Sequence, residues 1–103
     1  MVIETGKGLV ILCGCCHAGL LNTLAQVRRS QPGDILAILG GTHLGSATPE
    51  MLERAVGFLR ELNAGQPPAF YLNHCTGEAA WLALSRAFGD GVHTFPAGST
   101  LVF

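Results

Sequence analysis

Short runs of consecutive apolar residues alternate along the chain with longer segments in which apolar residues recur every three or four positions. The runs are typical of strands, and the spaced segments predict amphipathic helices. The expected strands are 2–4, 9–12, 35–39, 69–72, 92–95 and 100–103, with a hairpin at each end of the chain. The strand–helix alternation between these hairpins predicts an α/β protein with one mixed, mostly parallel sheet.

Three helices are expected between the strands. The first carries Leu20, Leu24 and Val27 at helical spacing, and the second is expected from residue 49 to about residue 63. Thr48 is a suitable N-cap for the second helix, because Pro49 follows it at the first helical position. The third helix is expected over residues 77–88, with the residue before it, a threonine, as its cap. Three crossover helices predict cover for one face of the sheet.

The second face of this sheet lacks a predicted cover. Segments 9–12 and 35–39 are apolar at every position, which is the pattern of strands buried on both faces. An uncovered apolar face is a large association surface. We therefore expect half of a sandwich, completed by another polypeptide or by a second copy of the chain.

Composition excludes several classes of protein. The chain has 103 residues, which fits a single domain, and its formal charge is −1 with six scattered basic residues, which argues against nucleic-acid binding. Charged residues make up 13% of the chain, about half of the usual share. No apolar run approaches the ~20 residues of a membrane span, and the first residues lack the features of a signal peptide. Four cysteines without an export signal predict reduced thiols in the cytoplasm.

Histidines follow three of the expected strands. His17, His43 and His74 each lie in a loop between an apolar run and a helical segment. Ligands of open parallel sheets bind beyond the carboxyl ends of the strands, so these loops are expected to meet at one edge. A single histidine there is more often a hydrogen-bonding residue, but three in equivalent positions favour a metal site that activates water. His93 lies within an expected strand and is interpreted as a packing residue.

The cysteines allow several interpretations. Residues 13–17 match the C-x-x-C-H pattern of covalent haem attachment, which usually requires export, and residues 13–16 also match a redox C-x-x-C. The helix that follows would lower a thiol pKa in the redox interpretation. A four-cysteine zinc site would need Cys75 as well. The interpretation of Cys13 and Cys75 as small, partly buried hydrophobic residues is favoured.

Three segments together resemble a known family. Residues 8–19 resemble the Gly-Cys-Ser-His-x-Gly segment found in a branch of the metallo-β-lactamase superfamily, residues 38–44 its Gly-Gly-Phe-His-Leu segment, and residues 73–78 its His-Cys-Thr-Gly-Glu segment. The three motifs occur in the same order and extend over nearly the whole chain. The branch includes metal-dependent hydrolases and proteins named after a ribofuranosylaminobenzene-phosphate synthase.

This resemblance implies that residues 1–103 form one domain, the C-terminal half of a four-layer αββα sandwich with metals at the edge between two sheets. By position His17 and His74 would be metal ligands, and His43 a further ligand or a substrate contact. The metal would be zinc or another divalent ion such as manganese or iron. Substrate-binding positions would be Cys16, Thr42 and Thr76, of which the first two replace the serine and phenylalanine that are common in the family.

One family motif has no counterpart in these residues. The main metal motif of the superfamily, His-x-His-x-Asp-His, belongs to the N-terminal half, and nothing in this chain matches it. The resemblance therefore implies hydrolase activity only together with a separate N-terminal-half polypeptide, and the isolated chain would bind metal weakly or hold none. The alternative is a non-catalytic, self-associating domain derived from the same fold. Whether the chain alone is an enzyme stays open.

Overall fold

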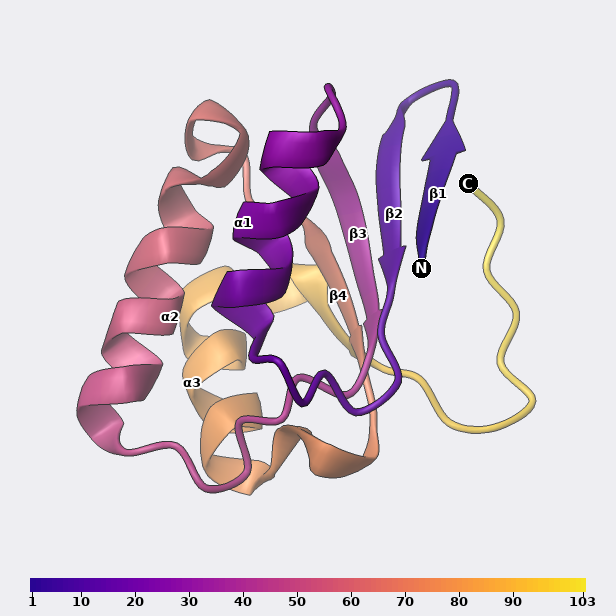
Figure 1. Cartoon of the computed structure of the whole chain (residues 1–103). Helices are drawn as coiled ribbons and strands as arrows, with labels where there is room; N and C mark the ends of the chain where they lie inside the picture. The colour runs from indigo at the N-terminus through magenta and orange to yellow at the C-terminus, as the bar shows by residue number, and fades with distance from the viewer.

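A five-stranded sheet with three helices on one side forms the fold (Figure 1). The computed structural model describes the backbone of residues 1–103 and every side chain except that of His74. The elements in chain order are β1 (Val2–Thr5), β2 (Gly8–Leu12), α1 (Leu20–Ser30), β3 (Ile35–Gly40), α2 (Pro49–Glu61), β4 (Ala69–Leu72), α3 (Glu78–Phe88) and β5 (Val92–Thr94). The strands lie in sequence order, with β1 antiparallel to β2 and the others parallel. The predicted mixed, mostly parallel sheet is confirmed.

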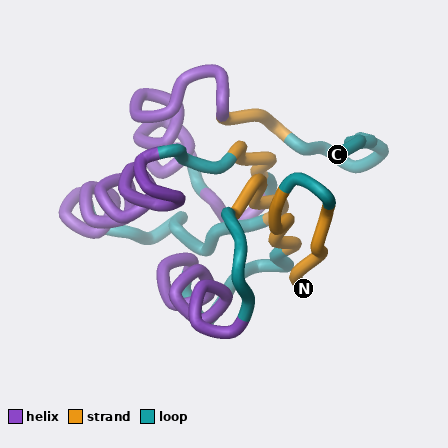
Figure 2. Tube along the Cα trace, turned by 90° about the horizontal axis from the view of Figure 1, so that it is seen from above, coloured by secondary structure: helices purple, strands orange, loops and turns teal.

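The main core lies between the sheet and the helices. Figure 2 shows the three helices on the same side of the strands. Alternate strand residues point to this side, including Ile11, Ile38 and Phe70, which are each at most 1% exposed. They pack against the apolar stripes of the helices, of which Leu24 in α1 and Leu84 in α3 are examples. This packing gives each crossover helix a fixed place above the sheet, and therefore fixes where each strand-end loop begins.

The ends of two helices differ from the predictions in part. Thr48 is the N-cap of α2, as predicted, and its hydroxyl accepts a hydrogen bond from the Met51 N–H at 3.3 Å. The α-helix ends at Glu61 rather than near Asn63, because Asn63 adopts a left-handed conformation with φ 51° and continues into a 3-10 turn (Leu62–Gly65). The prediction that Thr76 is the N-cap of α3 is wrong. Gly77 is the N-cap of α3 without a side-chain cap hydrogen bond.

The predicted second hairpin is also wrong. Residues 100–103 form no strand, and the segment after β5 turns at Pro96, where Ser99 N–H donates to the Pro96 carbonyl at 3.1 Å. A proline cannot donate to a strand ladder, so the chain leaves the sheet edge there. The segment then passes along the side of the sheet opposite the helices, as both views of the backbone show (Figures 1 and 2).

This C-terminal segment (residues 95–103) covers part of the second sheet face. Phe95 and Leu101 pack against a small core of Val10, Ala37 and Leu39, which are 1–7% exposed. The expectation of a wholly uncovered face is therefore corrected, because local apolar residues supply part of the cover. Beyond the segment, Ile3 in β1 and Leu12 in β2 remain 43% and 38% exposed. Within the described chain, no helix has the length and apolar character that crossing a bilayer requires.

Candidate metal centre

The three loops that follow β2, β3 and β4 are joined by backbone hydrogen bonds at the carboxyl edge of the sheet, which is the lower edge in Figure 1. These bonds continue the strand pairing past the ends of the strands. They are Cys13 N–H to the Leu39 carbonyl at 2.8 Å, Gly41 N–H to Gly14 at 2.9 Å and Asn73 N–H to Gly40 at 3.2 Å. The predicted meeting of the strand-end loops at one edge is confirmed for the backbone.

Two glycines allow this close approach. Gly40 has φ 111°, and a Cβ built on it would lie 2.0 Å from the carbonyl oxygen of Cys13. Gly77 has φ 78°, and its Cβ would lie 2.6 Å from the Cα of Gly45. Both positions combine a backbone conformation that L side chains rarely adopt with a direct backbone contact. The loops can therefore lie this close only with glycine at these positions.

His17 and His43 lie side by side at this edge. Their ring centroids are 4.4 Å apart and the ring planes are inclined by 35°. Both side chains are exposed, so their ring nitrogens are accessible from solvent. The backbone of His43 (φ 55°) and of Cys16 (φ 57°), the residue before His17, is left-handed, a conformation that is uncommon outside glycine and that occurs often at functional sites.

The third predicted ligand cannot be placed in the same way. His74 begins a 3-10 turn (His74–Thr76) directly after β4, and its side chain lies outside the described residues. Two imidazoles have the donor chemistry of a zinc site, which takes three or four protein ligands. Among the side chains that the structure describes, no three of the types His, Cys, Asp and Glu lie close enough together to hold a metal ion. The described part of the site therefore supplies two ligand candidates, and the ligand roles stay predictions.

The candidate substrate-binding residues differ in exposure. The Cys16 sulfur lies 3.4 Å from the Thr23 hydroxyl and is partly exposed. Thr42 is 0% exposed, and its hydroxyl has no hydrogen-bond partner within the described part of the structure. Thr76 is 4% exposed and donates to the Asn73 carbonyl at 3.0 Å. Of these three side chains, only that of Cys16 is appreciably exposed to solvent. Substrate binding by each of the three stays a prediction.

Comparison with known proteins agrees with this fold. A solved structure, that of Tm1679, "a metal-dependent hydrolase of the beta-lactamase superfamily", matches 99% of this chain with a TM-score of 0.90 and 30% sequence identity, and the match covers 39% of Tm1679. The resemblance to the metallo-β-lactamase superfamily is confirmed. The fold class is confirmed with it, as a sheet with three helices on one face that matches half of a metallo-β-lactamase-like fold.

A curated protein is also similar in sequence. It is the 7,8-dihydropterin-6-methyl-4-(beta-D-ribofuranosyl)-aminobenzene-5'-phosphate synthase of Methanocaldococcus jannaschii, which is 28% identical over the whole of this chain. The chain spans 34% of the length of that protein. No family model matches the chain. A match over about a third of a relative leaves the activity of the whole relative outside the comparison.

The cysteine interpretations can now be compared with the superfamily fold. Cys13, Cys15, Cys16 and Cys75 are thiols, and no three of them form a metal site, so the four-cysteine zinc interpretation is wrong. Burial, followed by the neighbouring Cys16, raises the pKa of the Cys13 thiol to about 12. The predicted lowering of a thiol pKa by the following helix is therefore wrong for Cys13. Burial and then Cys75 raise the pKa of Cys15 as well.

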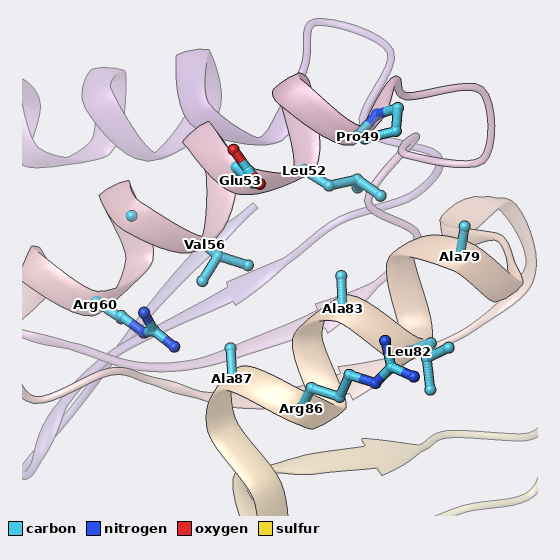
Figure 3. A pocket seen from close by; sticks show the side chains of 11 residues that line it. Pro49, Leu52, Glu53, Val56, Arg60, Ala79, Leu82, Ala83, Arg86 and Ala87 are labelled. Atoms are coloured by element: carbon cyan, nitrogen blue, oxygen red, sulfur yellow. The ribbon is translucent and has the colours of Figure 1, made fainter.

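Two cavities lie away from the pair formed by His17 and His43. The first, of about 660 Å³, is a groove between α2 and α3 where Ala83 and Ala87 of α3 point toward the helix that carries Leu52 and Val56 (Figure 3). The second, of about 420 Å³, lies between β1, β2 and α1 and is lined in part by Cys13 and Cys16. Neither is lined by His17 or His43. We place the candidate site at the strand ends, because ring donors lie there and open α/β sheets bind ligands there.

Proposed function

We propose that this chain is the C-terminal metal-binding part of a metal-dependent hydrolase, in which His17, His43 and His74 bind a divalent cation. The observation that carries the proposal is the contact between the His17 and His43 rings, whose centroids are 4.4 Å apart at the edge where the strand-end loops meet. Neutral imidazole binds zinc well and also suits iron or manganese, with zinc the first expectation. A bound cation with an open coordination position would activate a water molecule for hydrolysis.

We further propose that the remaining ligands come from an N-terminal half that carries His-x-His-x-Asp-His, and that the chain is inactive without it. The length of the curated relative supports this, because the chain spans 34% of that protein. The outer sheet face supports it too, since Ile3 and Leu12 remain 43% and 38% exposed there. In this proposal the sheet of the N-terminal half packs on that face and completes the cation site from the other side. Residues 1–103 then act as one domain in the cytoplasm.

Metal content tests the ligand assignment. The chain is expressed alone and with a polypeptide that carries His-x-His-x-Asp-His, dialysed against zinc and then against metal-free buffer, and analysed for elemental content. We expect His17→Ala and His43→Ala to lower the bound zinc of the complemented protein by at least about tenfold, because each removes one ligand. His93→Ala is the matched control, since His93 stacks on Tyr71 at 4.9 Å in the sheet, away from the loops. Unchanged zinc content in His17→Ala refutes the proposal.

A second function is favoured by the same outer face. We propose as the alternative a non-catalytic domain that self-associates through Ile3 and Leu12, with a second copy in place of the N-terminal half and no bound metal. Sedimentation equilibrium at low micromolar concentration separates the two. The alternative requires a homodimer that Ile3→Lys converts to a monomer, while Met51→Lys, a change at a 52% exposed residue on α2, leaves it intact. A monomeric wild-type chain excludes the alternative.

A further inference from the structure

The four thiols fall into two neighbouring pairs. The Cys16 thiol lies close enough to that of Cys13, and the Cys75 thiol to that of Cys15, to raise the pKa of the neighbouring thiol. All four are partly exposed. The first pair lies within one loop, whereas the second joins the loop after β2 to the turn after β4, which are separated by β3 in the sheet. Only the second pair therefore links parts of the chain that are distant in sequence.

The Cys15–Cys75 contact is held by the surrounding backbone. The Cys75 thiol donates to the carbonyl oxygen of Cys15 at 3.2 Å, across 60 positions of sequence. The turn that carries Cys75 is itself held in place, because Gly45 N–H donates to the Cys75 carbonyl at 3.2 Å and Gly77 packs directly on Gly45. Main-chain packing thus keeps the Cys75 thiol beside the backbone of Cys15, the residue that carries the other sulfur atom of the pair.

We propose that Cys15 and Cys75 are a modification site, at which a small-molecule disulfide such as oxidised glutathione produces a reversible intramolecular disulfide. One cysteine sulfur, on losing its proton, attacks oxidised glutathione, which forms a mixed disulfide and releases one glutathione. The second cysteine sulfur loses its proton and attacks the mixed disulfide, which closes the Cys15–Cys75 bond and releases the second glutathione. Two cysteines are oxidised and one glutathione disulfide is reduced, and the two cysteine protons end on the two glutathione thiols.

The bond would tie together the two loops that carry His17 and His74. It joins positions 60 apart in sequence and closes a loop that contains α1, β3, α2 and β4, so it restricts the unfolded chain strongly. The Cys75 thiol already lies 3.2 Å from the Cys15 carbonyl oxygen in the reduced chain, so we expect the bond to need little native rearrangement. The midpoint of thermal unfolding should therefore rise by more than roughly 5 °C on oxidation and return on reduction. This inference does not depend on a bound metal.

Peptide mapping of the full chain tests the site. The protein is incubated with oxidised glutathione, alkylated, and digested with trypsin without reduction, which separates the cysteines at positions 13, 15 and 16 (peptide 8–28) from Cys75 (peptide 61–86). We expect these two peptides to be joined, two hydrogens lighter than their sum, and to separate after treatment with dithiothreitol. The double variant Cys13→Ser/Cys16→Ser keeps only the proposed pair and should still form the link, whereas Cys15→Ser should not.

Each other result overturns the proposal. A bond within peptide 8–28 would assign the oxidation to Cys13 and Cys16 instead. Stable glutathione adducts on Cys15 and Cys75 without a link would show that the sulfur atoms do not meet. A link that persists in Cys15→Ser, or one that is lost in a folded Cys13→Ser/Cys16→Ser variant, would place the bond on another cysteine. Circular dichroism of each variant confirms that it is folded before the digest is interpreted.

Discussion

Replacing Gly40 with alanine should break the arrangement of the strand-end loops. The added Cβ would lie 2.0 Å from the Cys13 carbonyl oxygen, and φ is 111° at this position. The Cys13 carbonyl cannot move away without disturbing its own peptide, whose loop is held by the Cys13 N–H bond to Leu39 at 2.8 Å and by the Gly14 carbonyl bond to Gly41 at 2.9 Å. The backbone must therefore shift either at Gly40 or at Cys13.

The expected loss follows from these contacts. A non-glycine residue in a sparsely populated backbone region costs about 1–3 kcal/mol. Loss of the two loop hydrogen bonds adds about 1 kcal/mol for each. The total of about 3–5 kcal/mol is a large fraction of the ~5–15 kcal/mol by which a domain of this size is stable. Gly40→Ala should therefore be severely destabilising and at the limit of folding.

Urea unfolding, followed by far-UV circular dichroism and by the fluorescence of Trp81, measures this loss. The midpoint for Gly40→Ala should fall by roughly 2 M or more. Gly57→Ala is the matched control, because Gly57 lies inside α2 with nothing within 4 Å of an added Cβ. That change should instead stabilise the chain by about 0.5–1 kcal/mol. A Gly40→Ala chain within about 0.5 kcal/mol of the wild type would refute the reasoning.

Three further predictions concern single residues. The pKa of Cys13 is about 12 in the folded chain against an ordinary 9.0, so the stability that this thiol contributes below pH 9 is lost as the pH rises toward 12. In reducing buffer, the urea midpoint should accordingly fall more steeply between pH 9 and 12 for the wild type than for Cys13→Ala. Asn63→Ala should cost about 2–3 kcal/mol in thermal unfolding, because the amide accepts from Ile35 N–H at 2.9 Å and donates to the Ile35 carbonyl at 2.8 Å; a change below about 0.5 kcal/mol would contradict that role. Thr42→Val should leave the free energy of unfolding unchanged or raise it by about 1 kcal/mol, because the buried hydroxyl has no hydrogen-bond partner in the described structure. A loss of more than about 1 kcal/mol in urea unfolding would show that the hydroxyl does have a partner.

Local pattern was sufficient for most of the fold. Strands β2, β3 and β4 and all three α-helices follow from apolar runs and helical spacing, because these periods reflect which side of an element is buried. Thr48 and Pro49 predicted the start of α2 for a reason equally local, the capping of the first backbone donors. The three motifs around the strand ends were enough to identify the resemblance to the metallo-β-lactamase superfamily.

The errors occur where distant residues compete with local preference. Residues 100–103 have strand composition, yet Pro96 directs them away from the edge strand and their apolar side chains pack on the second sheet face instead. Asn63 ends α2 early because its amide binds the backbone of Ile35, 28 positions away. The spacing of apolar residues near residues 100–103 or near Asn63 does not indicate the distant residues that each contacts.

The sequence by itself therefore determined most of the elements, their order, and the fact that three histidines follow successive strands. Only the tertiary structure decided that the His17 and His43 ring centroids lie 4.4 Å apart, that Thr42 is fully buried, and that the Cys75 thiol donates to the Cys15 carbonyl. The physical reason is that a period of apolar residues specifies which face is buried. The meeting of two loop side chains depends instead on strand register, sheet twist and the close backbone contacts at glycine, which are properties of the packed chain.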